Sequence, residues 1–138
     1  TLVIFSAHSL PVRIMEQGDP YDSQLRESAR LVAEKVGLRN DQWTFSYQSA
    51  GRSPEPWLGP QIEEYVVELA AQGHKNLLSC VVGFVADHVE VLFDIDFEAK
   101  QAAEAAGARL ERVPSLNDDP RYIGALVDLI RQYERTEA

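Results

Sequence analysis

Four short apolar runs alternate with four amphipathic stretches along the chain. The apolar runs cover residues 2–5, 43–47, 76–85 and 108–113. Apolar residues recur at helical spacing over 21–36, from Pro60 to Gly73, from about His88 to Ala106, and from Pro120 to about Glu134. Strands that alternate with crossover helices predict an α/β fold: an open parallel sheet of four strands, flavodoxin-like, in three layers. The run at 76–85 is almost continuously apolar, which predicts a strand buried on both faces.

A ligand site is expected beyond the carboxyl ends of the strands, at the point where the strand order reverses. For the expected order 2-1-3-4, this point lies between the first and third strands. The segments that follow these strands, 6–11 and 83–90, contain His8 and His88. His74 follows a helix-ending glycine at the opposite end of the sheet, and we interpret it as a surface residue.

His8 is the first candidate for chemistry. A lone loop histidine is more often hydrogen-bonded to backbone than engaged in a reaction. Imidazole can also bind a metal or accept a proton near neutral pH. A second polar cluster, Asp87 to Glu90, is expected beside His8, and this proximity favours a functional role.

The acidic residues after the third strand allow two interpretations. Asp87 and Glu90 have the spacing of helix-capping residues. In the first interpretation they only cap the start of a helix. Glu90, Asp94 and Glu98 recur every fourth residue, which predicts three carboxylates on one helix face. This row is either a solvated acidic face or a path for a hydrated divalent cation, because such cations favour oxygen ligands. A histidine and a glutamate are too few for a structural zinc site and suit a metal that is held briefly and passed on.

The loop after the second strand carries Trp57 between Pro56 and Leu58. Trp57 either plugs the edge of the core or walls an apolar pocket for a flat ligand. The chain has neither a GxGxxG nor a GxxxxGK[ST] phosphate loop, and it has no GxSxG elbow. Nucleotide binding and acyl transfer are therefore disfavoured.

Composition and net charge argue against further classes of function. The chain has 13 Lys and Arg against 22 Asp and Glu, and its net charge is −9. Nucleic acid is not expected as a partner, because its binding requires clustered cationic charge. No apolar run reaches the roughly 18 residues of a transmembrane helix, and no secretory signal is expected. The single Cys80 cannot form an internal disulfide, which favours a reducing, cytoplasmic location.

The chain begins at Thr1, without Met, and enters an apolar strand at once. We interpret residues 1–138 as a single domain cut from a longer polypeptide. Removal of an initiator Met before Thr1 is the alternative.

Six segments together carry a family resemblance across the whole chain. They are SAHSLP at 6–11, GDPY at 18–21, YQSAG at 47–51, PEPWLGP at 54–60, GFVADHVEVLFDIDFE at 83–98 and PSLND at 114–118. In this order and spacing they resemble the ferrochelatases, which insert Fe(II) into a porphyrin in haem biosynthesis. The resemblance is to the C-terminal half of a two-domain protein whose halves are similar flavodoxin-like domains. It is strongest to the soluble Gram-positive-type members, which act on coproporphyrin III rather than protoporphyrin IX.

The resemblance implies a role for the residues around the expected site. His8 matches the family's metal-site histidine, which is also proposed to accept pyrrole protons. Glu90 matches its partner carboxylate, and which of the two binds iron first stays open. Asp87 and His88 match a polar pair that supports this site.

The resemblance also has implications for metal delivery, for the porphyrin pocket and for an iron–sulfur cluster. Asp94 and Glu98 match an acidic row proposed to carry metal inward, and we assign Trp57 to the wall of the porphyrin pocket. The N-terminal half, absent from this chain, is implied to supply much of that pocket, so the isolated chain is expected to be inactive. Some members hold a [2Fe–2S] cluster on cysteines of a C-terminal extension. Cys80 lies inside the third strand instead, so no cluster is expected.

Two alternatives stay open from the residues. A non-catalytic flavodoxin-like binding module has the same fold, and it is separated from a chelatase by whether His8 and Glu90 face one another. A chelatase that inserts cobalt into a sirohydrochlorin-type macrocycle is the second alternative. Those short relatives usually carry two site histidines, and Glu90 takes one of these places, which favours iron.

Overall fold

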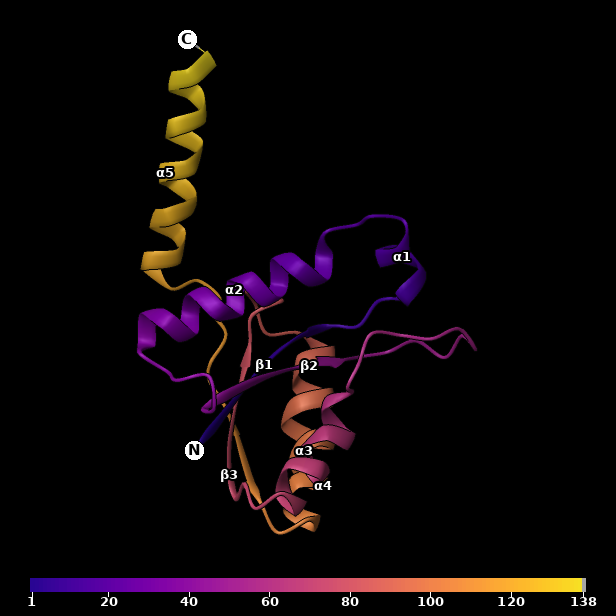
Figure 1. The fold of residues 1–138 in the computed structure, drawn as a ribbon. Helices are drawn as coiled ribbons and strands as arrows, with labels where there is room; N and C mark the ends of the chain where they lie inside the picture. The colour runs from indigo at the N-terminus through magenta and orange to yellow at the C-terminus, as the bar shows by residue number, and fades with distance from the viewer. Residues whose placement is uncertain (138) are drawn as a thin grey trace.

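The computed structural model describes residues 1–137 of the chain. Its centre is a sheet of four parallel strands with the order β2-β1-β3-β4 (Figure 1). The strands are β1 (Leu2–His8), β2 (Trp43–Gln48), β3 (Asn76–Val81) and β4 (Arg109–Arg112). The predicted α/β fold and the order 2-1-3-4 are confirmed.

Helices connect the strands and follow the last one. They are α1 (Val12–Glu16), α2 (Tyr21–Val36), α3 (Ile62–Ala71), η1 (Val91–Ala99), α4 (Lys100–Ala105) and α5 (Pro120–Glu137). The bounds of α2 match the prediction, and the helix ends at Gly37, whose φ of 84° is left-handed and favours glycine. The sequence analysis missed α1, because one short turn after Pro11 has no helical periodicity to detect.

The first strand is longer than predicted. It continues past Phe5, because residues 6–8 pair in register with residues 46–48 of β2. His8 is therefore the last residue of a strand and not a loop residue, which corrects the prediction. Its main chain is part of the sheet.

The third strand is shorter than predicted. It ends at Val81 and not at Val85, because the chain turns across the end of β1. The amide of Gly83 donates to the carbonyl of Ser6 at 3.1 Å. The crossing places Gly83 against Ser6 and Ala7, near the end of β1.

Helices cover the two faces of the sheet unequally. On one face α3, η1 and α4 pack on a large core that includes Ile4, Ile62, Val66, Leu77, Val91, Ile95 and Leu110. On the other face α2 packs around Phe5, Ala7, Ala29, Phe45 and Tyr47, over β1 and β2. Leu78 and Cys80 of β3 are only half-buried. The prediction that β3 is buried on both faces is therefore wrong for the α2 side, where Cys80 is only partly covered by the core around α2.

The third helical stretch is a π-helix over most of its length. Residues 91–99 have the wide π turn, with hydrogen bonds to the carbonyl five residues earlier, and α4 continues them as an α-helix. Long π-helices are rare, and π turns are frequent at functional sites. The stretch begins and ends close to the predicted bounds, but its backbone geometry differs from the expected α-helix.

The last helix projects away from the sheet (Figure 1). α5 continues to Glu137, beyond the predicted end near Glu134. It exposes the apolar side chains of Ile123, Leu126, Leu129 and Ile130. Neither α5 nor any other helix within residues 1–137 has the length and apolarity that crossing a membrane requires.

Candidate functional site

His8 ends the central strand at the carboxyl edge, beside Gln48 of β2. Its Nδ1 lies 2.5 Å from the carbonyl oxygen of Ser9. A carbonyl can only accept, so Nδ1 carries the hydrogen, and the lone pair of the neutral imidazole is on Nε2. The hydroxyl of Tyr21 donates to the His8 carbonyl at 2.8 Å and helps to fix the main chain. The His8 side chain is 31% exposed, so Nε2 is accessible to a ligand.

Glu90 faces His8 from the start of the helix, directly before η1, where its φ of −64° and ψ of −45° are α-helical. Its Oε2 lies 3.3 Å from Nε2 of His8 and 3.9 Å from Nε2 of His88. With a lone pair on Nε2, His8 Nε2 and Glu90 Oε2 are both acceptors. They therefore require a proton or a cation between them. Bonds of about 2.1 Å to one metal, at an angle of about 105°, separate N and O by about 3.3 Å. The geometry therefore fits either a shared proton or one divalent cation.

The pair is an incomplete ligand set. In the described part of the chain, no three His, Cys, Asp or Glu side chains converge in a way that could hold a metal ion. His88 is partly exposed, and its Nδ1 lies 3.3 Å from the carbonyl of Ala86. Two protein ligands leave the other coordination positions to water or substrate, which suits transient binding.

A close chain crossing brings the two sides of the pair together. A Cβ at Gly83 would lie 2.5 Å from Cβ and 2.8 Å from Cα of Ala7, so only glycine fits this crossing. The next residue, Phe84, packs its ring against both imidazoles. The ring centroids are 6.2 Å from His8 and 4.3 Å from His88. Phe84 therefore makes one side of the site apolar.

The carboxylates after Glu90 follow the wide turns of η1. Ser49 has a left-handed backbone conformation, with φ of 62°. Its hydroxyl donates to the Asp94 carboxylate. Glu98 is exposed one turn further along. The four-residue spacing thus lies on a π-helix instead of the expected α-helix. The role of the row in metal delivery stays a prediction.

Glu63 of α3 adds a carboxylate to this region. Burial, and then the negative charges of Glu98, Glu64 and Asp94, raise the pKa of Glu63. Glu63 was not a candidate in the sequence analysis, because nothing in the helical pattern of α3 indicates which residues of η1 it meets. The region around η1 is therefore more acidic than the row alone.

Asp87 is held by the segment that follows β4. Its Oδ1 accepts from Nη1 of Arg112 at 3.0 Å and its Oδ2 from Nδ2 of Asn117 at 3.2 Å. Hydrogen bonds from Ser115 and Asn117, together with the charge of Arg112, lower the pKa of the Asp87 carboxyl. These contacts account for Asp87 without a helix-capping role.

Trp57 is half-buried in the loop between β2 and α3. Its backbone pairs with Pro11, and its indole N–H donates to the Ser53 hydroxyl at 3.0 Å. The ring packs on Gly51, where any Cβ would clash with it. These contacts order the loop, and the place of Trp57 in a pocket wall stays a prediction.

Some residues at this edge escaped the sequence analysis. Arg112 and Ser49 were not candidates, although PSLND at 114–118 marked the segment that contacts Asp87. Both act through contacts with residues far away in the sequence, which periodicity does not reveal. His74 lies two residues before β3, at the opposite edge from His8, as expected, and is half-buried.

The fold and the site together define a class of protein. It is an open parallel α/β domain with an imidazole–carboxylate pair at the carboxyl edge of its sheet. The sequence model of the ferrochelatase family matches residues 1–134, and the chain belongs to this family. A ferrochelatase from Deinococcus radiodurans is 58% identical over 130 residues, which are 94% of this chain and 41% of that protein. A coproporphyrin III ferrochelatase from Geobacillus sp. is 45% identical over the same shares of the two chains. The chain thus spans about two fifths of the length of these relatives.

A solved structure supports the fold independently. A cobalamin (vitamin B12) biosynthesis CbiX protein from Marinobacter aquaeolei superposes with a TM-score of 0.59 and is 15% identical. The alignment covers 98% of each chain. At this identity the likeness shows the fold alone, and it agrees with the predicted chelatase-type domain.

Proposed function

We propose that the polypeptide carrying this chain inserts Fe(II) into a porphyrin, and that this chain supplies the groups that handle metal and protons. The observation that carries the proposal is the 3.3 Å separation of His8 Nε2 and Glu90 Oε2 in a member of the ferrochelatase family. A non-catalytic binding module would not require two acceptors to face one another beside an apolar wall.

The reaction releases two pyrrole protons and exchanges the water ligands of iron for pyrrole nitrogens. The lone pair on Nε2 of His8 can accept a proton from a pyrrole N–H, while Nδ1–H stays bonded to the Ser9 carbonyl. The imidazolium formed is then stabilised by the Glu90 carboxylate. The same two atoms can instead hold Fe(II) while it loses water. The order of these two events is open, and both use the same pair.

The acidic region along η1 is proposed to deliver the metal. Asp94 and Glu98 lie one and two turns from Glu90, with Glu63 close to both. Oxygen donors at successive turns can pass a hydrated divalent cation along the helix. The hydrogen bond from Ser49 holds the Asp94 carboxylate in place.

The substrate and partners follow from the same proposal. Relatives named coproporphyrin III ferrochelatases favour coproporphyrin III, with protoporphyrin IX as the alternative. The N-terminal half of the longer polypeptide is the proposed partner, and Trp57 is assigned to the pocket wall. We expect the isolated chain to bind porphyrin weakly. A cytoplasmic location and the lack of an iron–sulfur cluster belong to the same proposal.

The test is a His8→Ala substitution in the complete polypeptide, with His74→Ala as the matched control at the opposite edge of the sheet. Loss of a proton acceptor at the reacting centre costs about 10²- to 10⁴-fold in rate. We expect this loss for His8→Ala and wild-type turnover for the control, with both porphyrins assayed by loss of fluorescence on addition of Fe(II). Near-wild-type metal insertion by a stable His8→Ala protein would contradict the proposal.

A further inference from the structure

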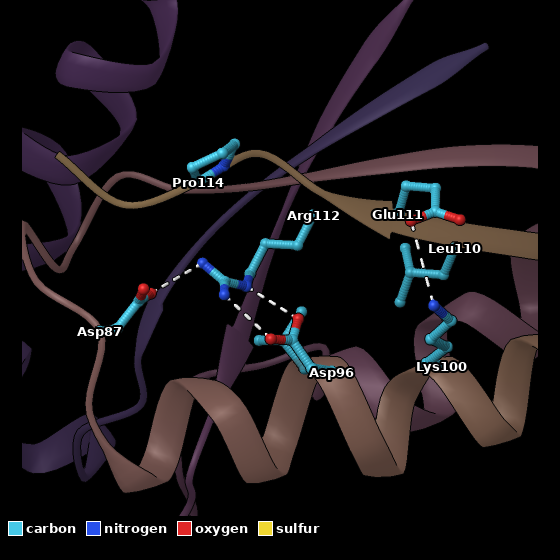
Figure 2. Close-up of a pocket in the computed structure, with 8 residues that line it drawn as sticks. Asp87, Asp96, Lys100, Leu110, Glu111, Arg112 and Pro114 are labelled. Carbon is cyan, nitrogen blue, oxygen red and sulfur yellow. Dashed lines mark hydrogen bonds and ion pairs between the residues drawn. The ribbon is translucent and has the colours of Figure 1, made fainter.

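The guanidinium of Arg112, in β4, contacts Asp87 and Asp96 (Figure 2), which precede and follow Glu90 in the sequence. Nε and Nη2 donate to both carboxylate oxygens of Asp96, at 2.8 and 2.9 Å, and Nη1 donates to Asp87 at 3.0 Å. Nη1 also lies 3.3 Å from the carbonyl of Val113. The Arg112 side chain is only 11% exposed, whereas the side chains of Asp87 and Asp96 are 36% and 39% exposed.

Asn117 holds the same segment from the other side. Its side-chain oxygen accepts from the amide of Asp87 at 2.8 Å, and its Nδ2 donates to the Asp87 carboxylate. Its own amide donates to the carbonyl of Val85 at 2.8 Å. Asn117 has a left-handed φ of 48°, a conformation that asparagine tolerates better than most residues. Arg112, Asn117, Asp87 and Asp96 are called the Arg112 network below.

The Arg112 network brackets Glu90 in the sequence. Asp87 precedes Glu90 by one short turn, and Asp96 lies within η1. The backbone between these two anchored points includes the start of the helix, where Val89 and Glu90 are α-helical and the π geometry begins at Val91. The position of the Glu90 carboxylate relative to His8 therefore depends on how both ends of this segment are held.

We propose that Arg112 is the positioning residue that sets the Glu90 carboxylate at ligand distance from His8. This inference rests on the proposed function, because it assigns a partner to the same pair. Arg112 does not touch the pair itself. It acts by holding the backbone of residues 87–96 to β4, which is a strand of the rigid sheet.

The chemistry of the side chain explains why arginine is used. A planar guanidinium presents parallel N–H groups to one carboxylate and a further N–H to a second, which a lysine ammonium cannot do. Two carboxylates and one cation also leave the network with net negative charge. Loss of the guanidinium therefore releases the Asp96 end of the segment and leaves Asp87 with its hydrogen bonds to Asn117.

The first experiment measures binding of Zn(II), used as a redox-stable probe, by the complete polypeptide without porphyrin. Loss of a residue that orients a metal ligand commonly weakens metal binding about 10- to 100-fold. We expect about tenfold weaker Zn(II) binding for Arg112→Gln and a smaller loss for Arg112→Lys, which keeps the charge. The matched control is Arg109→Gln in the same strand, since Arg109 forms an exposed pair with Glu111 and should leave the affinity unchanged.

The second experiment is a double-mutant cycle with Glu90→Gln. If Arg112 acts through Glu90, Arg112→Gln weakens Zn(II) binding in the wild-type background and has little further effect when Glu90 is already replaced. A purely structural role predicts the same loss in both backgrounds. Equal losses, or no loss in the wild-type background, would overturn the inference.

A milder variant keeps the inference testable if Arg112→Gln fails to fold. Asp96→Asn keeps an oxygen that accepts from Arg112 but removes the charge, and we expect the same pattern with a smaller amplitude. Amide hydrogen exchange over residues 87–92 should accelerate in the Arg112 and Asp96 variants and not in Arg109→Gln. Unchanged exchange in this segment would also overturn the inference.

The failure of this inference is distinguishable from the failure of the proposed function. The proposed function fails if His8→Ala still inserts Fe(II), whatever the Arg112 variants do. The positioning role fails if the cycle is additive, even in a fully active enzyme.

Discussion

His8 and Glu90 meet at one point but are held there by different kinds of structure. His8 ends a central strand, with backbone pairing to β2 and the Gly83 crossing above it. Glu90 lies in the α-helical residues directly before the π-helix, and side chains from β4 and the segment after it hold Asp87, three residues earlier. The backbone ladder of a sheet yields only with the whole fold, whereas a side-chain network can yield locally. One member of the pair is thus placed by the sheet and the other by a few ionic contacts.

The sharpest test of this difference is removal of the Glu90 charge. Glu90→Gln keeps the shape of the side chain but cannot stabilise an imidazolium or bind a divalent cation well. We expect the maximal rate of metal insertion to fall by about 10²-fold or more, with an unchanged Tm, because the exposed side chain contributes little to packing. Steady-state assays at saturating porphyrin and Fe(II) check the rate. A large loss of Tm would mean that Glu90 belongs to the fold as much as His8 does.

Gly83 links the two regions, so its replacement should affect both. Gly83→Ala forces a Cβ against Ala7, and overpacking of this kind costs about 1–3 kcal/mol. We expect a lower free energy of unfolding by chemical denaturation. The control is Gly124→Ala in α5, where a Cβ meets open space and alanine is the better helix former. Equal stability of the two variants would show that the crossing can relax.

The next prediction concerns the acidic residues that follow Glu90 along η1. Asp94→Asn still accepts from Ser49, so the substitution removes a charge and little else. We expect the Fe(II) concentration for half-maximal rate to rise about two- to fivefold, the effect of one partly screened charge, with the maximal rate unchanged. Initial rates at varied Fe(II) measure this, with the exposed Asp128→Asn in α5 as control. If neither rate nor iron dependence changes, the row is a solvated helix face.

Glu63 gives the smallest expected effect. Its pKa is raised in the folded protein by burial and by the charges of Glu98, Glu64 and Asp94, so folding favours its protonated form. The ionised form therefore destabilises the fold at pH 7, and this penalty disappears as the pH falls below the unfolded pKa of about 4.3. Glu63→Gln should raise stability at pH 7 by at most about 0.5 kcal/mol, because water screens a partly exposed carboxyl.

Thermal unfolding at pH 7 and at pH 4 checks this sign. The gain from Glu63→Gln should shrink at the lower pH. A gain that is equal at both values would mean that the carboxyl does not contact the acidic region through its charge.

The sequence predicted the parts of the site that depend on topology. The alternation of strands and helices implied a parallel sheet, and a parallel sheet brings the ends of its first and third strands together. The segments with His8 and Glu90 had to meet there for the same reason. The end of β3 was predicted wrongly, because it depends on the close approach of Gly83 to Ala7, which no local pattern records.

The π geometry and the Arg112 network were not predictable by the same reasoning. Apolar residues at i and i+4 suit an α-helix and a π-helix almost equally, so spacing does not distinguish them. Arg112 is a charged residue in a short strand, with nothing nearby in the sequence to indicate that Asp96 and Asp87 converge on it. Side-chain pairs between distant elements depend on the packed fold and become visible only there.

The projection of α5 has a consequence for how the domain folds. Helices α2, α3, η1 and α4 pack on the sheet and should unfold with it as one cooperative unit. An amphipathic helix of this length has little stability in water without a surface to cover its apolar side. We therefore place residues 120–137 outside that unit. Their amides should exchange fast while those of β1 and β3 stay protected, and a protease should remove them before the sheet opens.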